Sequence, residues 1–322
     1  MEDFFANLHL GWNTVLFILG AILVIWGAEK FLGGAIFIAE AADIPKVVVG
    51  ATIVSVATTF PEFSVSFSAA FMGKPLLAVG NAVGSYLCNI GLIVGLSALV
   101  RAYTVPRKTL RTQGFFALGA ALALAAVSTN ETVGRPVGVL FFLGFIGFLI
   151  YNWRLSLAEE KLSTGEVQFA KGEWVRQSIW FVIGAASVGV GSILLVQNGA
   201  AIARHVGVSE LIIGLTIVAV GTSLPEITLA IVSMLKGHSD LSLGNILGAN
   251  VLNILWVVGA CALVQPLPIV RQNRVLDIPF TLILIGILVG FGLARNKIGR
   301  WEGGLLVGFY AIYLVLMGVF FL

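Results

Sequence analysis

The chain has 322 residues, of which 58% are hydrophobic and 11% are charged, and its formal net charge is +3. So few charged residues cannot cover a soluble domain of this length, and the composition also excludes a disordered, collagen-like or coiled-coil protein. The small net charge argues against nucleic acid as a partner. Cys88 and Cys261 both lie in apolar segments, where we expect them to pack rather than to form a disulfide.

Charge-free stretches divide the chain into predicted transmembrane helices, each long enough or nearly so for the ~20 residues that cross a bilayer. Glu2 and Asp3 replace the basic start of a signal peptide, so we expect the first helix to be retained. Two further stretches, 47–73 and 211–235, contain one carboxylate each, Glu62 and Glu226. The prediction is an all-α integral membrane protein with ten transmembrane helices, eight of them from the stretches 4–28, 75–100, 112–130, 136–153, 177–203, 241–270, 278–294 and 303–322.

Lysine and arginine residues fall unequally on the two sides of these predicted helices. One side carries 13 of them and the other side carries 5. The positive-inside rule then places the polar loop 154–173 in the cytoplasm and both termini on the extracytoplasmic side of the cell (inner) membrane. This linker loop separates five helices in residues 1–153 from five helices in residues 174–322.

The two halves repeat one another in sequence. Shifting the chain by 164 positions places residues 50–95 on residues 214–259 without a gap, and 17 of the 46 positions are identical. Proline, glutamate and asparagine are among the identical residues, which chance similarity between apolar helices would not produce. Because each half has an odd number of predicted helices, the second copy enters the membrane from the opposite side. Inverted repeats of this kind are typical of alternating-access transporters.

Glu62 and Glu226 lie near the middle of their predicted helices, and neither helix contains lysine or arginine. A carboxylate at this depth costs roughly 2.5 to 3.5 kcal/mol on insertion scales, and it is kept where it lines a cavity or has a partner. Two such groups brought together by the repeat would repel each other unless a cation lay between them. Hard cations prefer oxygen ligands, and Ca²⁺ takes six to eight.

Further oxygen atoms occur at helical spacing from these acids. Pro61 and Pro225 each remove an N–H group and free the carbonyl four residues before, so we expect broken helices that offer main-chain ligands. The Gly-x-x-x-Gly spacings that begin at Gly80 and Gly244 indicate close helix packing. Asn81 and Asn245 are expected to support the site rather than bind ions. Side chains that share a helix face four residues apart are Thr58 with Glu62, Ser85 with Asn89, and Thr222 with Glu226.

Two motifs in each half carry a family resemblance. They read Ala57-Thr-Thr-Phe-Pro-Glu62 with Gly80-Asn-Ala-Val-Gly-Ser-Tyr-Leu-Cys-Asn89, and Gly221-Thr-Ser-Leu-Pro-Glu226 with Gly244-Asn-Ile-Leu-Gly-Ala-Asn-Val-Leu-Asn253. They resemble the two α-repeats of the Ca²⁺/cation antiporter superfamily, most closely its prokaryotic Na⁺/Ca²⁺ exchangers. The resemblance implies that Ca²⁺ and Na⁺ are the transported ions, without an organic cofactor, and that the first and sixth helices slide past the site. It implies ligands from Glu62, Glu226, Asn89, Asn253, Thr58, Thr59, Ser85, Thr222, Ser223 and the carbonyls of Ser55 and Ala219.

Three positions depart from the family pattern. Ala249 stands where a serine is common, Tyr86 replaces an asparagine that Asn250 retains, and Asn253 leaves two carboxylates in the site instead of three. Exchange of Ca²⁺ for H⁺ is the main alternative, since two close carboxylates could release protons instead of Na⁺, and a passive cation channel is a less favoured one. An enzyme is not expected, because the chain has no His-Glu-x-x-His motif and no acid pair with a nucleophile. The site needs one chain only, so an oligomer is not required.

Overall fold

The computed structural model describes residues 10–41, 46–104, 107–160, 171–205, 215, 219–235 and 238–321. These residues are almost entirely helical, with four strands of two residues each. The all-α class predicted from the apolar stretches is therefore confirmed. Several helices contain π-helical segments, labelled η, in which the backbone hydrogen bonds span five residues instead of four.

The first half of the chain runs from α2 to α9. Its helices end at short polar or glycine-containing turns. The elements are α2 (Leu10–Ala41), α3 (Lys46–Val49), η1 (Gly50–Val54), α4 (Ser55–Phe71), α5 (Pro75–Cys88), η2 (Asn89–Val94), α6 (Gly95–Val100), β1 (Tyr103–Thr104), α7 (Arg107–Thr109), η3 (Leu110–Gly114), α8 (Phe115–Val127), β2 (Thr132–Val133) and α9 (Arg135–Glu160).

The second half begins at α10. α9 continues to Glu160 and α10 begins at Lys171, so both helices overlap the predicted linker 154–173, of which residues 161–170 lie outside the described residues. The elements are α10 (Lys171–His205), α12 (Ala219–Thr222), α13 (Leu224–Leu235), α14 (Ser239–Leu252), η5 (Asn253–Val258), α15 (Gly259–Val264), β3 (Leu267–Pro268), η6 (Asn273–Asp277), α16 (Ile278–Arg295), β4 (Lys297–Ile298) and α17 (Arg300–Phe321).

Seven helical stretches of the described residues are long and apolar enough to cross a membrane. Two of them form the centre of the molecule. In the most apolar 18 residues of each span, 78% of Pro75–Val100 and 83% of Asp240–Val264 is buried, compared with 20% of Gly11–Ala35. The buried pair carries the asparagine-containing motifs of both halves. The other candidate spans are Arg107–Val127, Arg135–Leu155, Asn273–Arg295 and Arg300–Phe321.

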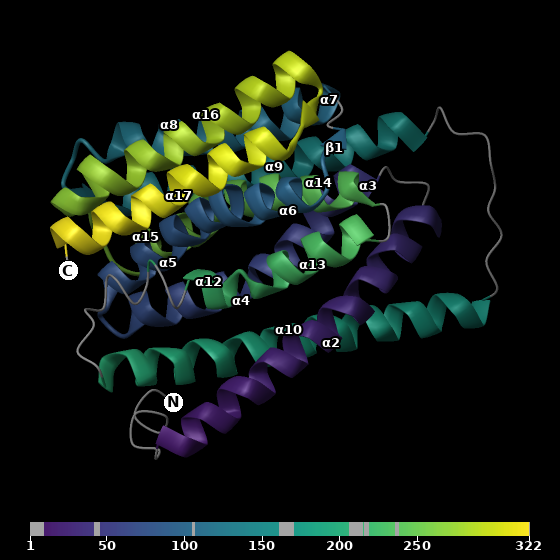
Figure 1. The fold of residues 1–322 in the computed structure, drawn as a ribbon, viewed down its shortest axis with the longest axis horizontal. Coiled ribbons are helices and arrows are strands. Elements are labelled where there is room, and N and C mark those ends of the chain that lie inside the picture. The colour runs from purple at the N-terminus through teal and green to yellow at the C-terminus, as the bar shows by residue number, and fades with distance from the viewer. Residues whose placement is uncertain are drawn as a thin grey trace.

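The long helices α2 and α10 pack against each other along one side of the remaining helices (Figure 1). A Cβ atom added to Gly27 would lie 2.8 Å from the carbonyl oxygen of Gly184, so the two backbones approach closely there. Trp26 and Trp180 meet edge to face at 6.1 Å. Lys30 lies 5.4 Å from the centre of the Trp180 ring, a cation–π contact that keeps its charge beside the helix pair.

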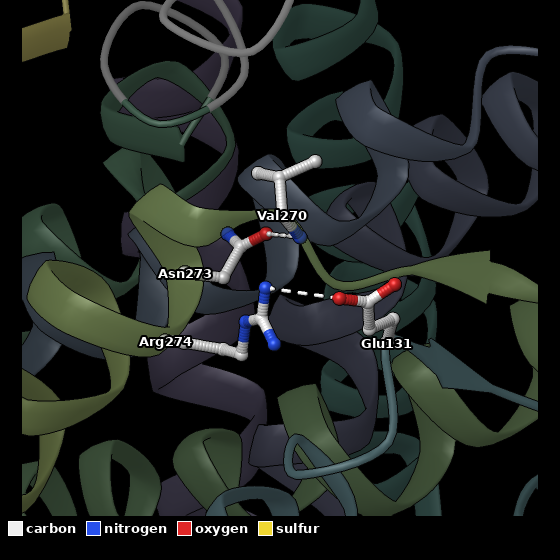
Figure 2. Close-up of polar contacts among 4 residues, drawn as sticks. All are labelled: Glu131, Val270, Asn273 and Arg274. Atoms are coloured by element: carbon white, nitrogen blue, oxygen red, sulfur yellow. Dashed lines mark hydrogen bonds and ion pairs between the residues drawn. The ribbon is translucent and has the colours of Figure 1, made fainter.

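The strands tie the two halves together at the ends of the helices. β1 pairs antiparallel with β4, and β2 pairs antiparallel with β3. Figure 2 shows the contacts beside the second pair: Arg274 forms an ion pair with Glu131 at 3.4 Å, and the Val270 N–H donates to the Asn273 side-chain oxygen at 3.1 Å. Both members of the ion pair are exposed, so the hydrogen-bonded strands rather than this pair fix the arrangement.

Candidate ion-binding site

The repeated motifs of the two halves contact each other at the centre of the molecule. Thr58 on α4 donates its hydroxyl to the side-chain oxygen of Asn245 on α14 at 3.1 Å. Thr222 on α12 donates in the same way to Asn81 on α5, also at 3.1 Å. Thr58 and Thr222 are equivalent positions of the repeat, as are Asn81 and Asn245. Each half is therefore held by the other through a matched pair of buried hydrogen bonds.

Glycines of the Gly-x-x-x-Gly motifs make this approach possible. A Cβ atom added to Gly84 would lie 2.8 Å from the Leu215 carbonyl oxygen, and one added to Gly248 would lie 2.7 Å from the Ala51 carbonyl oxygen. Any larger residue would push the crossing helices apart. The close packing expected from the spacing is confirmed, and it again occurs at equivalent positions of the two halves.

Glu62 and Glu226 are both completely buried. One oxygen of Glu62 accepts a hydrogen bond from the Ser223 hydroxyl at 3.2 Å, while its other oxygen has no hydrogen-bond partner in the part of the chain that the structure describes. Neither oxygen of Glu226 has a hydrogen-bond partner among the described residues. Burying carboxylates without basic or hydrogen-bonding partners is strongly unfavourable. Their presence points to a cation as the missing partner.

Buried amide and hydroxyl oxygens accompany the carboxylates. The side-chain oxygens of Asn89 and Asn253 and the hydroxyl of Thr59 are buried and have no partner in the described part of the chain. Thr59 lies on α4 itself, and Asn89 and Asn253 are the first residues of η2 and η5. η5 packs against α4, and η2 packs against α13, which carries Glu226. Together with the free carboxylate oxygens they make six buried, unpartnered oxygen atoms. This number matches the lower end of Ca²⁺ coordination.

Other hydroxyl groups of the motifs form hydrogen bonds within the protein. The hydroxyl of Ser55, a residue predicted to bind through its carbonyl, donates to the Gly50 carbonyl at 2.6 Å and lies 3.0 Å from the Asn245 carbonyl. Ser85 lies 3.4 Å from both the Ala219 carbonyl and the Thr222 hydroxyl. A hydroxyl oxygen that donates one hydrogen bond still has lone pairs for a cation, so these contacts orient the ligands without blocking them.

The main-chain geometry differs from the expected broken helices. α4 continues through Pro61. In the second copy, described from Ala219 onward, the helix is interrupted at Ser223, whose N–H still donates to the Ala219 carbonyl at 3.0 Å. The Ala219 carbonyl also accepts from Thr222 at 3.3 Å, and the Ser55 carbonyl is 3.5 Å from the Thr58 hydroxyl. Threonines three residues ahead thus engage these two predicted carbonyl ligands, and side-chain oxygens make up most of the site.

Supporting residues hold the ligands in place. Asn81 donates to the main-chain oxygen of Glu62 at 3.1 Å and to the Ser66 hydroxyl at 2.8 Å. Asn89 donates its amide to the side-chain oxygen of Asn250 at 2.9 Å, which leaves the Asn89 oxygen free. Sequence reasoning did not assign a role to Ser66 or Asn250. The role of Asn250 could have been inferred from its position between Gly248 and Asn253 in the repeated motif.

Tyr86, which was noted in the sequence, and Asp277, which was not, form hydrogen bonds with other parts of the protein. The hydroxyl of Tyr86 donates to the Ala117 carbonyl on α8 at 2.8 Å, so the side chain that replaces an asparagine points out of the site. Asp277 is a third completely buried acid, which the sequence reading missed because it precedes the charge-free stretch 278–294. Asn273 donates to it at 2.8 Å and Tyr313 at 3.1 Å, so its carboxylate is satisfied without a cation.

Fold and site together define a multi-pass helical membrane protein with a buried polar centre. The family model described as sodium/calcium exchanger protein matches the chain twice, over residues 12–154 and 177–319. The chain therefore belongs to the sodium/calcium exchanger protein family, whose members are transporters. The two matches fall on the two repeats found in the sequence.

Relatives and solved structures agree over nearly the whole chain. A putative antiporter, CaxA, from Alkalimonas amylolytica is 34% identical over 314 residues, which cover 94% of this chain and 98% of that protein. The sodium/calcium exchanger MaX1 from Methanosarcina acetivorans is 26% identical, with 95% and 98% covered. The structure of the sodium-calcium exchanger NCX_Mj matches with a TM-score of 0.81 and 30% identity, covering 95% of this chain and 99% of that one.

Proposed function

We propose that this protein exchanges Ca²⁺ for Na⁺ across the membrane, moving Ca²⁺ outward as Na⁺ enters down its gradient. The observation that carries the proposal is that six buried oxygen atoms of the repeated motifs, three of them from Glu62 and Glu226, have no hydrogen-bond partner among the described residues. The two carboxylates supply a charge of about −2, which one Ca²⁺ or two Na⁺ would balance. Once one kind of ion has neutralised the two carboxylates, they no longer attract the other kind electrostatically.

The family and its named members support this choice of ions. Family membership supports a transporter rather than an enzyme. MaX1 is a sodium/calcium exchanger by name, and NCX_Mj was studied after soaking with Na⁺ together with Sr²⁺ or Ca²⁺. Na⁺, Ca²⁺ and Sr²⁺ all prefer oxygen ligands of the kind gathered here. Neither an organic cofactor nor an oligomer is required by the proposal.

We further propose that ten helices cross the membrane as two inverted five-helix repeats, with both termini outside the cytoplasm and the chain in the inner membrane. Matched contacts across the repeat support this arrangement, because Thr58 with Asn245 and Thr222 with Asn81 are related by exchanging the halves. An inverted pair of repeats gives a site that can open to either side with similar energies.

Movement of α2 and α10 relative to the other helices would expose the site alternately. The close contact between Gly27 and Gly184 packs α2 tightly against α10. Aromatic and cation–π contacts also join these two helices, so they would move as one unit. The hydrogen-bonded motifs of α4, α5, α12 and α14 would stay fixed around the ions.

Flux measurements in sealed vesicles test the proposal. Purified protein is reconstituted, and ⁴⁵Ca²⁺ uptake is driven either by an outward Na⁺ gradient or by a pH gradient of equal driving force. We expect the Na⁺ gradient to drive uptake. Uptake driven by the pH gradient alone would replace Na⁺ by H⁺ as the counter-ion, and uptake independent of both gradients would indicate a passive channel.

A further inference from the structure

An apolar groove of about 580 Å³ lies on the outer side of the helix that carries Glu62, between that helix, α9 and α10. Its walls include Ile53 and Val56, Ile150 of α9 and Phe181 of α10. The one hydroxyl within its lining, that of Thr52, donates to the Val48 carbonyl at 2.7 Å. The body of the groove therefore offers a surface suited to a hydrocarbon chain rather than to a polar ligand.

The groove ends at Trp153 and Arg154, which are the last aromatic and the last basic residue of the candidate span Arg135–Leu155. Tryptophan and arginine at the end of a span are typical of the boundary between hydrocarbon and lipid headgroups. Arg154 is exposed and has no hydrogen-bond or ion-pair partner among the described residues. Its guanidinium is therefore available to an anion at the mouth of the groove.

The length of the groove matches one side of the bilayer. Its wall on the continuous stretch of α3, η1 and α4 extends from Val48 to Ala57, which at 1.5 Å per residue is about 13 Å. This is roughly half of the ~30 Å hydrocarbon core. A ligand that fills the groove is thus as long as the acyl region of one leaflet, with its polar end at Arg154.

We propose that this groove binds an anionic phospholipid, with one acyl chain along Ile53, Val56 and Ile150 and the phosphate at Arg154. The opposite face of the same helix carries Ser55, Thr58 and Glu62, which are all buried. A lipid in the groove supports α4 against α9 directly behind the ion ligands. Membrane composition would then influence the rigidity of the ion site. This inference does not depend on which ion is exchanged.

Native mass spectrometry of the purified full chain tests the site with phosphatidylglycerol and phosphatidylcholine. We expect tighter binding of phosphatidylglycerol, and an approximately fivefold loss of that binding in Arg154→Ala, since one basic residue near a headgroup contributes ~1 kcal/mol. Arg154→Lys should restore much of it. Arg300→Ala is the matched control, because Arg300 is also exposed at a helix end but does not line the groove.

Ile150→Trp tests the proposed contact with the acyl chain, because the larger side chain fills the groove. This variant should bind neither lipid in the groove, and it should unfold at a temperature similar to that of the parent protein. A second groove beside α8 contains Arg111, so the measured quantity is the lipid lost on substitution and not the total bound. Equal affinities for the two lipids, or equal binding by Arg154→Ala and Arg300→Ala, would overturn the proposal. A dimer that Ile150→Trp dissociates would assign the groove to a second copy of the chain instead.

Discussion

Glu62 and Glu226 occupy equivalent positions of the repeat but have different surroundings. Ser223 donates a hydrogen bond to Glu62, whereas the hydroxyl of the equivalent residue in the first half, Thr59, has no partner among the described residues. Within the same part of the chain, neither carboxylate oxygen of Glu226 has a hydrogen-bond partner. The two acids therefore have asymmetric surroundings, and we expect Glu226 to need a bound cation more than Glu62 does.

Replacing either carboxylate by its amide should abolish exchange. Glu62→Gln and Glu226→Gln each remove half of the site's negative charge while keeping its shape, so a divalent ion is no longer balanced. We expect Na⁺-driven ⁴⁵Ca²⁺ uptake to fall to background with normal amounts of folded protein in the membrane. Glu131→Gln, which alters an exposed acid far from the motifs, is the control and should transport normally. Near-normal transport by either site variant would rule out the proposed site.

Asn253 allows the charge of the site to be changed in the other direction. Both polar atoms of its side chain are buried and have no partner among the residues that the structure describes, as expected for a residue that faces the ions. Asn253→Asp adds a third carboxylate close to two others, and protons should then compete with cations for it. Na⁺-driven Ca²⁺ flux in this variant should fall more steeply than in the parent as the pH drops from about 8 to 6. Superimposable pH profiles would show that residue 253 does not face the ions.

At the scale of elements, the sequence predicted which segments meet but not how their backbones bend. The shared Pro-Glu pair suggested two equally broken helices, yet α4 is continuous through Pro61, and between Ala219 and Leu235 the second copy is interrupted at one residue, Ser223. Helical hydrogen bonds persist on both sides of Ser223, from its own N–H and from that of Ile227. A proline removes one donor only, and whether the remaining bonds hold depends on packing that a local sequence pattern does not contain.

Close helix crossing can be tested at Gly84. An added methyl group would meet the backbone oxygen of Leu215 and the Cβ of Ala219, both at 2.8 Å, and neither can move away easily. Gly84→Ala should therefore destabilise the protein by about 1–3 kcal/mol, despite the better helix propensity of alanine. Thermal unfolding in detergent measures the change. Gly286→Ala on α16, where an added Cβ has no neighbour within 4 Å, should leave the unfolding temperature unchanged or raise it, and an equal loss in both would contradict the packing argument.

For the whole molecule, the internal repeat predicted more than composition alone. Identical prolines, glutamates and asparagines at a fixed offset identified the residues that gather at the centre, and both motifs are buried there. Contacts that join different repeat positions could not be predicted in this way. Asn89 bonds to Asn250, which is equivalent to Tyr86 and not to Asn89, and buried Asp277 is matched by a glutamine in the first half. A repeat pattern shows which residues correspond, not which of them touch.

Membrane orientation is a property of the whole chain and needs its own test. The 13-to-5 distribution of basic residues predicts a cytoplasmic loop around Gly165, which lies outside the described residues. A cysteine introduced by Gly165→Cys should react with impermeant reagents only from the cytoplasmic side. The native cysteines, Cys88 and Cys261, are buried and provide a low background. Labelling from the opposite side would reverse the proposed direction of every helix.

Equilibrium Ca²⁺ binding, with Na⁺ as competitor, tests most directly whether the two ions share one site at Glu62 and Glu226. If both ions bind the same two carboxylates, Na⁺ should displace bound ⁴⁵Ca²⁺ from the purified protein in detergent. We also expect Glu226→Gln to lose Ca²⁺ binding and Glu131→Gln to retain it. Ca²⁺ affinity that is unchanged by Na⁺, or that survives in Glu226→Gln, would contradict exchange through this site.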